Sequence, residues 1–144
     1  MMKILVINGP NLNFLGIREP EVYGSKTLEK LNEEIEILGK RLEIEVKFYQ
    51  SNHEGQIIDK IQESYNVIDY LIINPGALTH YGIGIRDAIL STGIKTIEVH
   101  LSNVYSREEF RHKSVISDIV VGKITGFGSE SYKMALHYLN SLKK

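Results

Sequence analysis

Ile4-Leu5-Val6-Ile7-Asn8-Gly9-Pro10 opens the chain and decides its fold class. Four consecutive apolar residues are typical of a strand that is buried on both faces, as in a parallel sheet covered by helices. Leu71-Ile72-Ile73-Asn74-Pro75-Gly76 repeats this arrangement further along the chain. Each run ends at an asparagine and continues into a turn with glycine and proline. The two segments therefore predict two central strands of one parallel sheet.

Three further apolar segments complete a set of five expected strands, at residues 44–49, 96–101 and 119–121. Amphipathic stretches separate the strands and predict helices between them. The expected helices cover residues 28–42, residues 57–65, a third from a cap at Thr79 to Gly93, a short fourth capped by Ser106 and Glu109, and a last one opened by Ser129. Regular alternation of strand and helix predicts a three-layer α/β fold with a five-stranded parallel sheet.

Length and composition exclude several classes of protein. The chain has 144 residues, which suits one domain spanning residues 1–144 and is too short for a barrel of eight strand–helix units. A formal net charge of -1 without basic clusters gives no sign of nucleic-acid binding. No apolar run is long enough for a membrane span. Cysteine is absent, which removes disulfides and thiolate chemistry and fits a cytoplasmic protein.

The chemistry is expected at the carboxyl ends of the strands, where open parallel sheets bind ligands. The sequences that mark phosphate-binding and dinucleotide-binding loops are missing from the turns after the strands. A magnesium-dependent signalling domain is also disfavoured, because Asn8 and Asn74 stand where carboxylates would be needed. A zinc site of His80, Asp87 and His100 is conceivable, although no characteristic ligand spacing supports it.

Two pairs of residues indicate acid–base chemistry. Glu98 and His100 lie two apart in a strand, so they share one face, and His100 is a possible general acid that Glu98 orients. The long loop between Gly9 and Gly24 carries Arg18 and Tyr23. A nearby arginine cation favours the ionised phenol, which would make Tyr23 a base. Arg107 and Arg111, four residues apart on one expected helix face, suit an anionic or polyhydroxylated ligand.

These segments together resemble one family, the type II 3-dehydroquinate dehydratases. The resemblance covers essentially the whole chain, in order and with long motifs. It rests on Ile7-Asn8-Gly9-Pro10-Asn11-Leu12-Asn13, Leu15-Gly16-Ile17-Arg18-Glu19-Pro20, Tyr23-Gly24, Ser51-Asn52-His53-Glu54-Gly55, Asn74-Pro75-Gly76-Ala77, His80-Tyr81, Arg86-Asp87-Ala88, Glu98-Val99-His100-Leu101-Ser102-Asn103 and Arg107-Glu108-Glu109-Phe110-Arg111-His112.

The resemblance implies a flavodoxin-like fold without flavin or any other cofactor or metal, and dehydration of 3-dehydroquinate to 3-dehydroshikimate in the shikimate pathway. Tyr23 would remove the proton next to the ketone, and Arg18 would keep Tyr23 ionised. Asn11 would help to hold a water that stabilises the enolate. His100, oriented by Glu98, would protonate the leaving hydroxyl. The implied substrate-binding residues are Asn74, Gly76, His80, Leu101, Ser102, Arg107 and Arg111, together with Asp87, which would reach a neighbouring subunit's site.

The resemblance also implies a homo-oligomer, a dodecamer built from trimers. Tyr105 departs from the family pattern, since many relatives have histidine there, and we expect it to tune the rim of the pocket. Two alternatives stay open at this point: an inert flavodoxin-like module that binds a small polyhydroxy acid, and a structural assembly subunit. Neither would need both a base and an acid.

Overall fold

A five-stranded sheet forms the centre of the computed structural model, which describes residues 1–17, 21 and 25–143. The strands are β1 (Met2–Asn8), β2 (Ile44–Gln50), β3 (Tyr70–Asn74), β4 (Lys95–His100) and β5 (Gly122–Thr125). Their order across the sheet is β2-β1-β3-β4-β5, and every neighbouring pair is parallel. The predicted parallel sheet with central strands at residues 4–7 and 71–73 is therefore confirmed.

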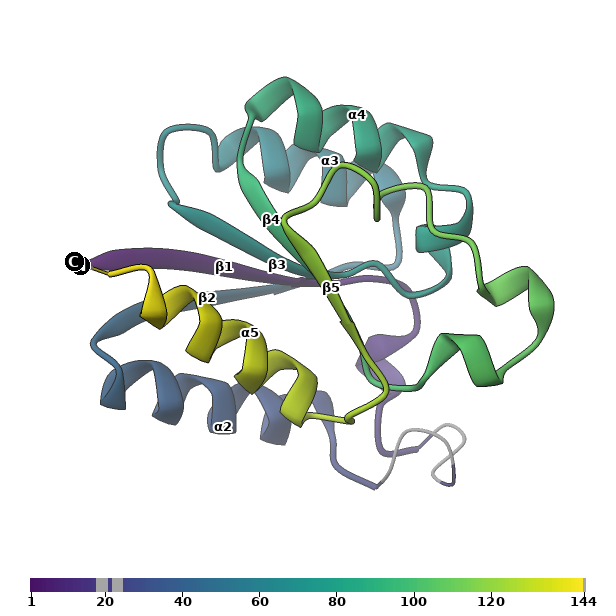
Figure 1. Ribbon diagram of the computed structural model, residues 1–144, viewed down its shortest axis with the longest axis horizontal. Coiled ribbons are helices and arrows are strands. Elements are labelled where there is room, and N and C mark those ends of the chain that lie inside the picture. The colour runs from purple at the N-terminus through teal and green to yellow at the C-terminus, as the bar shows by residue number, and fades with distance from the viewer. Residues whose placement is uncertain (18–20, 22–24, 144) are drawn as a thin grey trace.

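Helices cover both faces of this sheet (Figure 1). On one face lie α2 (Leu28–Arg41) and α5 (Glu130–Ser141), and on the other lie α3 (Glu54–Glu63) and α4 (Ile83–Thr92). This three-layer arrangement confirms the predicted flavodoxin-like fold. Among the residues that the structure describes, no helix has the length and apolar character needed to span a membrane.

The apolar run in β1 contributes to two separate cores because successive side chains of a strand point to opposite faces. Ile4 and Val6 belong to the core beneath α2 and α5, whereas Leu5 and Ile7 belong to the core beneath α3 and α4. All four side chains are buried. Burial on both faces explains why this strand is apolar throughout and why it fixes the centre of the sheet.

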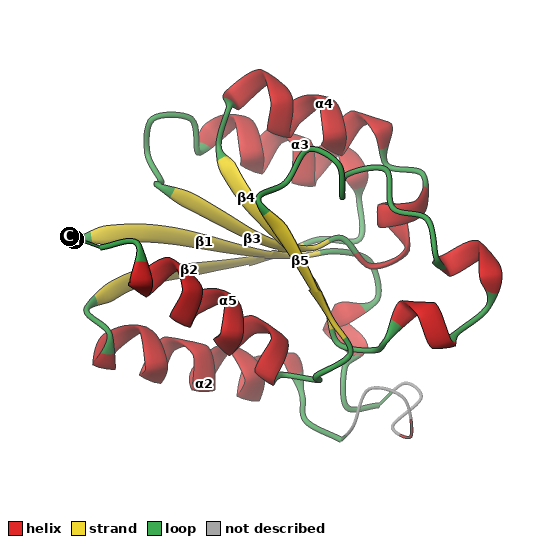
Figure 2. Cartoon of the chain, viewed as in Figure 1, coloured by secondary structure: helices red, strands yellow, loops and turns green. Residues whose placement is uncertain are grey.

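Two of the expected elements are wrong. Residues 119–121 are not a strand, and β5 begins only at Gly122. Figure 2 shows the loop that leads into β5. Ile119 and Val120 are apolar because they pack from a loop against the core beneath α3 and α4. The expected fourth helix is replaced by two short 3₁₀ turns, Val104–Ser106 and Glu109–Arg111. Ser106 donates a hydrogen bond to the Asn103 carbonyl and caps no helix.

Candidate active site

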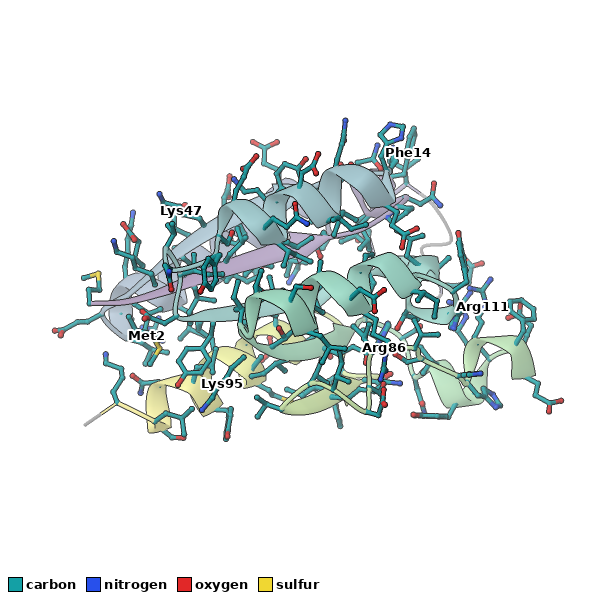
Figure 3. All side chains as sticks on the ribbon, turned by 90° about the horizontal axis from the view of Figure 1, so that it is seen from above. Met2, Phe14, Lys47, Arg86, Lys95 and Arg111 are labelled. Carbon is teal, nitrogen blue, oxygen red and sulfur yellow. The ribbon has the colours of Figure 1, made fainter. Side chains whose placement is uncertain are left out.

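The carboxyl ends of β1, β3 and β4 meet at one edge of the sheet. From β1 the chain crosses to β2 on one side and returns to β3 on the other, so the strand order reverses between β1 and β3. Ligands of open parallel sheets bind outside the strand ends at such a point. Figure 3 shows Phe14 and Arg111 at this end of the molecule, and Met2 and Lys95 at the opposite end.

Two turns interlock at this edge, which explains their glycines. The Gly9 N–H donates to the Asn74 carbonyl at 2.8 Å, and a Cβ atom at Gly9 would run into the Pro75 backbone. Gly76 has a positive φ of 60°, and a Cβ there would lie 3.0 Å from the Pro10 carbonyl oxygen. Only glycine allows this conformation and this close approach without strain. The two asparagine-led turns thus form one rigid floor.

A buried hydrogen-bond network fixes the two strand-end asparagines. The Tyr132 hydroxyl, on α5, donates to Asn8 Oδ1 at 2.5 Å and accepts from Asn74 Nδ2 at 2.9 Å. Asn74 Oδ1 in turn accepts the Gly76 N–H at 3.1 Å. Burial raises the pKa of Tyr132 above its ordinary value, so the phenol stays protonated and able to donate. The network sets the orientation of the Asn74 amide.

The end of β2 braces the loop that carries Asn11. Asn11 has a positive φ of 70°, a conformation that asparagine tolerates better than most residues. Its N–H donates to Asn52 Oδ1 at 3.0 Å, and Gln50 Nε2 donates to both Asn52 Oδ1 and the Gly9 carbonyl at 3.2 Å. Through these contacts, Gln50 and Asn52 hold Asn11 at the mouth of the site.

A buried carboxylate–imidazole pair lies at the end of β4. Glu98 is 0% exposed and His100 is 5% exposed. The His100 Nε2 atom is 2.5 Å from Glu98 Oε2, and since an ionised carboxylate can only accept, Nε2–H is the donor. That contact fixes the ring and leaves Nδ1 as its second polar atom. The predicted juxtaposition of Glu98 and His100 is present.

Hydroxyl groups surround the remaining positions of the Glu98 carboxylate. Thr79 donates to Oε2 at 2.7 Å, while Ser114 and Ser117 donate to Oε1 at 3.1 and 2.6 Å. Burial alone would raise the pKa of Glu98, but the hydrogen bond and charge of His100, with Ser117 and Thr79, outweigh it and lower that pKa to about 2. Glu98 is therefore a carboxylate at neutral pH. Thr79, which was expected to cap a helix, serves this carboxylate instead, and α4 begins after Gly82.

A depression opens above this pair. Its walls come from the β1 and β3 turns, the end of β4 and the two 3₁₀ turns that follow β4. The lining residues are Pro10, Asn11, Leu12, Asn74, Gly76, Ala77, His80, His100, Leu101, Ser102, Val104, Arg107 and Arg111. Polar, cationic and backbone groups thus converge on a space suited to a small, hydroxylated anion.

Three basic residues stand at the rim. His80 Nδ1 donates to the Lys113 carbonyl at 2.7 Å, which fixes the ring. Arg111 donates from Nε to Glu108 at 3.2 Å, and its guanidinium lies 4.9 Å from the centre of the Phe110 ring. Arg107 and Arg111 do not share a helix face as expected, because each lies at the end of a different 3₁₀ turn. Both nevertheless line the depression.

Comparison with known proteins assigns the chain to a protein family. The model of the family described as Dehydroquinase class II matches residues 2–140. The chain belongs to this family. A 3-dehydroquinate dehydratase of Endomicrobium trichonymphae is 57% identical over 142 residues, which cover 99% of each chain.

Solved structures of family members have the same fold. A type II dehydroquinase from Butyrivibrio crossotus matches with a TM-score of 0.94 and 58% identity, over 96% of this chain and 97% of that one. The type II dehydroquinase from Propionibacterium acnes also gives a TM-score of 0.94 at 40% identity, over 98% of this chain and 97% of that one. Similar fold, length and sequence leave no large part of the chain unaccounted for by the family.

The structure brings together most of the residues that the dehydroquinase resemblance implies. Asp87 is an exception, since it is exposed on α4 and does not line the depression of its own chain. Arg18 and Tyr23 lie outside the described residues. Within the described residues, no group of three or more His, Cys, Asp or Glu side chains is placed to hold a metal ion, so His80, Asp87 and His100 do not form the conceivable zinc site.

Sequence reasoning missed the residues that support the site from a distance. Tyr132 was expected only as part of the buried face of the last helix, and its hydroxyl bonds to a residue 124 positions away. Ser114 and Ser117 lie in a loop with no pattern that indicates a partner. Only the motif Ser51-Asn52 gave a signal, because it formed part of the resemblance.

Proposed function

We propose that the chain catalyses the dehydration of 3-dehydroquinate to 3-dehydroshikimate, as a type II dehydroquinase of the shikimate pathway. Membership of the family over residues 2–140 supports the reaction, together with relatives that are named 3-dehydroquinate dehydratase. The observation that carries the proposal is the buried Glu98–His100 pair at the edge of a polar, cationic depression. No comparison favours the inert binding module or the structural subunit.

The proposed reaction begins with Tyr23, whose ionised phenol takes the proton from the carbon next to the ketone. Arg18 favours that ionised form. The electrons of the broken C–H bond form an enolate, which needs stabilisation as its negative charge develops. A water that Asn11 helps to hold is assigned to this task, because Asn11 lines the depression and its backbone N–H is bonded to Asn52.

His100 completes the reaction as the general acid. With Nε2–H held by Glu98, the ring must carry a proton on Nδ1 to donate into the depression, and the Glu98 carboxylate compensates the resulting positive charge. That proton passes to the leaving hydroxyl, which departs as water while the carbon–carbon double bond forms. Tyr23 and His100 then exchange their protons with solvent for the next cycle.

Binding is proposed for the remaining lining residues. Asn74, Gly76, Leu101 and Ser102 surround the strand ends, where backbone N–H groups can hold a carboxylate. His80, Arg107 and Arg111 would hold hydroxyl groups and close the rim. Residues 1–144 would act as one catalytic domain without a cofactor, in the cytoplasm.

A dodecamer built from trimers is the quaternary state that we propose. Asp87 is exposed and absent from its own depression, as expected if it serves a neighbouring chain. Large apolar side chains are exposed near it, with Tyr81, Ile83 and Leu90 between 53% and 64% exposed. Light scattering would measure the mass in solution. A monomeric mass would contradict this assembly but would not contradict the reaction proposed for the residues of one chain.

One assay tests the reaction and the base together. The purified protein is mixed with 3-dehydroquinate, and the absorbance of the conjugated enone product is followed. We expect a rise with wild type, a loss of at least about 10²-fold with Tyr23→Phe, and no loss with Tyr138→Phe, which changes a tyrosine on the outer face of α5. No rise with wild type would reject the reaction. A rise that survives Tyr23→Phe would reject the base.

A further inference from the structure

Lys123 lies directly beside the acid pair, on the neighbouring strand. In the register of β4 and β5, Lys123 is the partner of Glu98, so the two side chains share one face of the sheet. The Lys123 side chain is 14% exposed, although β5 is an edge strand. Its Nζ atom lies 4.0 Å from Glu98 Oε2, the same oxygen that accepts from His100. A lysine ammonium group and an imidazole N–H therefore approach one carboxylate oxygen.

Tyr105 holds the other side of the Lys123 ammonium group. Lys123 Nζ donates to the Tyr105 hydroxyl at 3.2 Å and lies 5.0 Å from the centre of the Tyr105 ring. The Tyr105 ring is in turn 5.8 Å from the His112 ring, which contacts the Arg107 carbonyl at 3.1 Å. The ammonium group thus lies between the buried carboxylate and the Tyr105 side chain, rather than extended into solvent.

Other charged groups around the pair are arranged differently. Glu98 Oε1, the oxygen that does not face His100 and Lys123, accepts from the hydroxyls of Ser114 and Ser117, in the loop after the Glu109–Arg111 turn. Oε2 also accepts from the Thr79 hydroxyl of the η2 turn (Gly76–His80). His80, Arg107 and Arg111 line the depression on the His100 side. Arg86, on α4, is paired with Asp118 at 2.5 Å. Among the described residues, Lys123 and His100 are the two basic side chains with an ion-pair contact to Glu98.

We propose that Lys123 is a positioning residue of the acid pair: it shares the charge of Glu98 with His100 and so makes His100 release its proton more readily. The inference rests on the proposed function. When the His100 ring is doubly protonated, its charge and that of Lys123 repel each other, and transfer of the His100 proton to the leaving hydroxyl relieves that repulsion. Afterwards Lys123 still compensates the buried carboxylate, so the neutral imidazole does not leave Glu98 as an unpaired charge.

An NMR titration of the His100 ring tests this coupling without any turnover. Its signal is assigned by its loss in His100→Gln. Lys123→Met removes the charge and keeps the apolar stem, and it should raise the midpoint of the His100 titration by on the order of one pH unit. Lys123→Arg keeps the charge and should stay near wild type, as should Lys95→Met at the opposite end of β4 (Figure 3). An unchanged or lowered midpoint in Lys123→Met would overturn the proposal.

Kinetics distinguish an electrostatic effect of Lys123 on His100 from a purely structural role of Lys123. If Lys123 acts on the acid, Lys123→Met should lower kcat several-fold at neutral pH with little change in KM, and Lys123→Arg should restore kcat. Tyr105→Phe, which keeps the ring and removes the acceptor, should give a smaller change in the same direction. A rise in KM with unchanged kcat would overturn the proposal. Absence of wild-type turnover would instead reject the proposed reaction and leave the NMR result standing.

Discussion

Replacing Glu98 by glutamine should remove a large pH-dependent part of the stability of the fold. Glu98 is fully buried, and its contacts lower its pKa from 4.5 to about 2. Each unit of difference between the folded and unfolded states is worth about 1.4 kcal/mol, so the ionised carboxylate contributes about 3 kcal/mol at pH 7. Because the folded pKa is the lower one, this contribution is present above the unfolded value and is lost as the pH falls towards 2.

The substitution is mild in shape, which keeps the comparison clean. The amide oxygen can still accept from His100, and the amide nitrogen can donate to Ser114 and Ser117, whose hydroxyls can turn to accept. What disappears is the negative charge. We therefore expect a folded variant that is less stable at pH 7 and that approaches wild type in stability as the pH falls.

The assay is urea unfolding, followed by circular dichroism from pH 3 to pH 7 at one fixed chain concentration. Glu34→Gln is the matched control, because the ion pairs of Glu34 with Lys26 and Lys133 on the surface also lower its pKa to about 2. The wild-type minus Glu98→Gln difference should grow by about 3 kcal/mol between the acid limit and neutral pH. If the stability of wild type and that of Glu98→Gln changed equally with pH, the reasoning would be refuted.

Three further substitutions test the supports of the site. Tyr132→Phe should cost about 3 kcal/mol, measured by urea unfolding, because it leaves two buried asparagine side chains each short of one hydrogen bond; a cost well under 1 kcal/mol would contradict this. Gly9→Ala should reduce kcat/KM by at least about 10-fold, since its methyl group would push the Pro75 turn away; normal kinetics would mean that the turns can separate freely. Arg18→Ala should lower turnover far more than Asn13→Ala, and comparable losses would mean that Arg18 has no special effect on the base.

Continuous apolar runs were the most informative part of the sequence for the fold. Residues 4–7 and 71–73 are buried on both faces of the sheet. Their continuous apolar sequence indicates such a strand, so these strands were predicted correctly. Residues 119–121 gave a false strand because a loop that packs on a core is also apolar. The true edge strand at Gly122–Thr125 is only partly buried, and its alternating sequence carries little signal.

The candidate site could be predicted where neighbours in space are neighbours in sequence. Glu98 and His100 share a strand face, and the asparagines at positions 8 and 74 end adjacent strands. Contacts between distant segments could not be predicted, because nothing local in α5 indicates that the Tyr132 hydroxyl meets β1 and β3. The pairing of Lys123 with Glu98 likewise depends on a strand whose start was misplaced.

The most direct test of the account is the turnover of 3-dehydroquinate by His100→Gln, compared with wild type and with His137→Gln. His137 lies on α5 beside a separate surface groove, away from the depression. The account predicts that His100→Gln lowers kcat by about 10²-fold to 10⁴-fold, the usual contribution of a general acid, and that His137→Gln matches wild type. A His100→Gln enzyme within a few-fold of wild type would contradict the assignment of this buried pair as the acid.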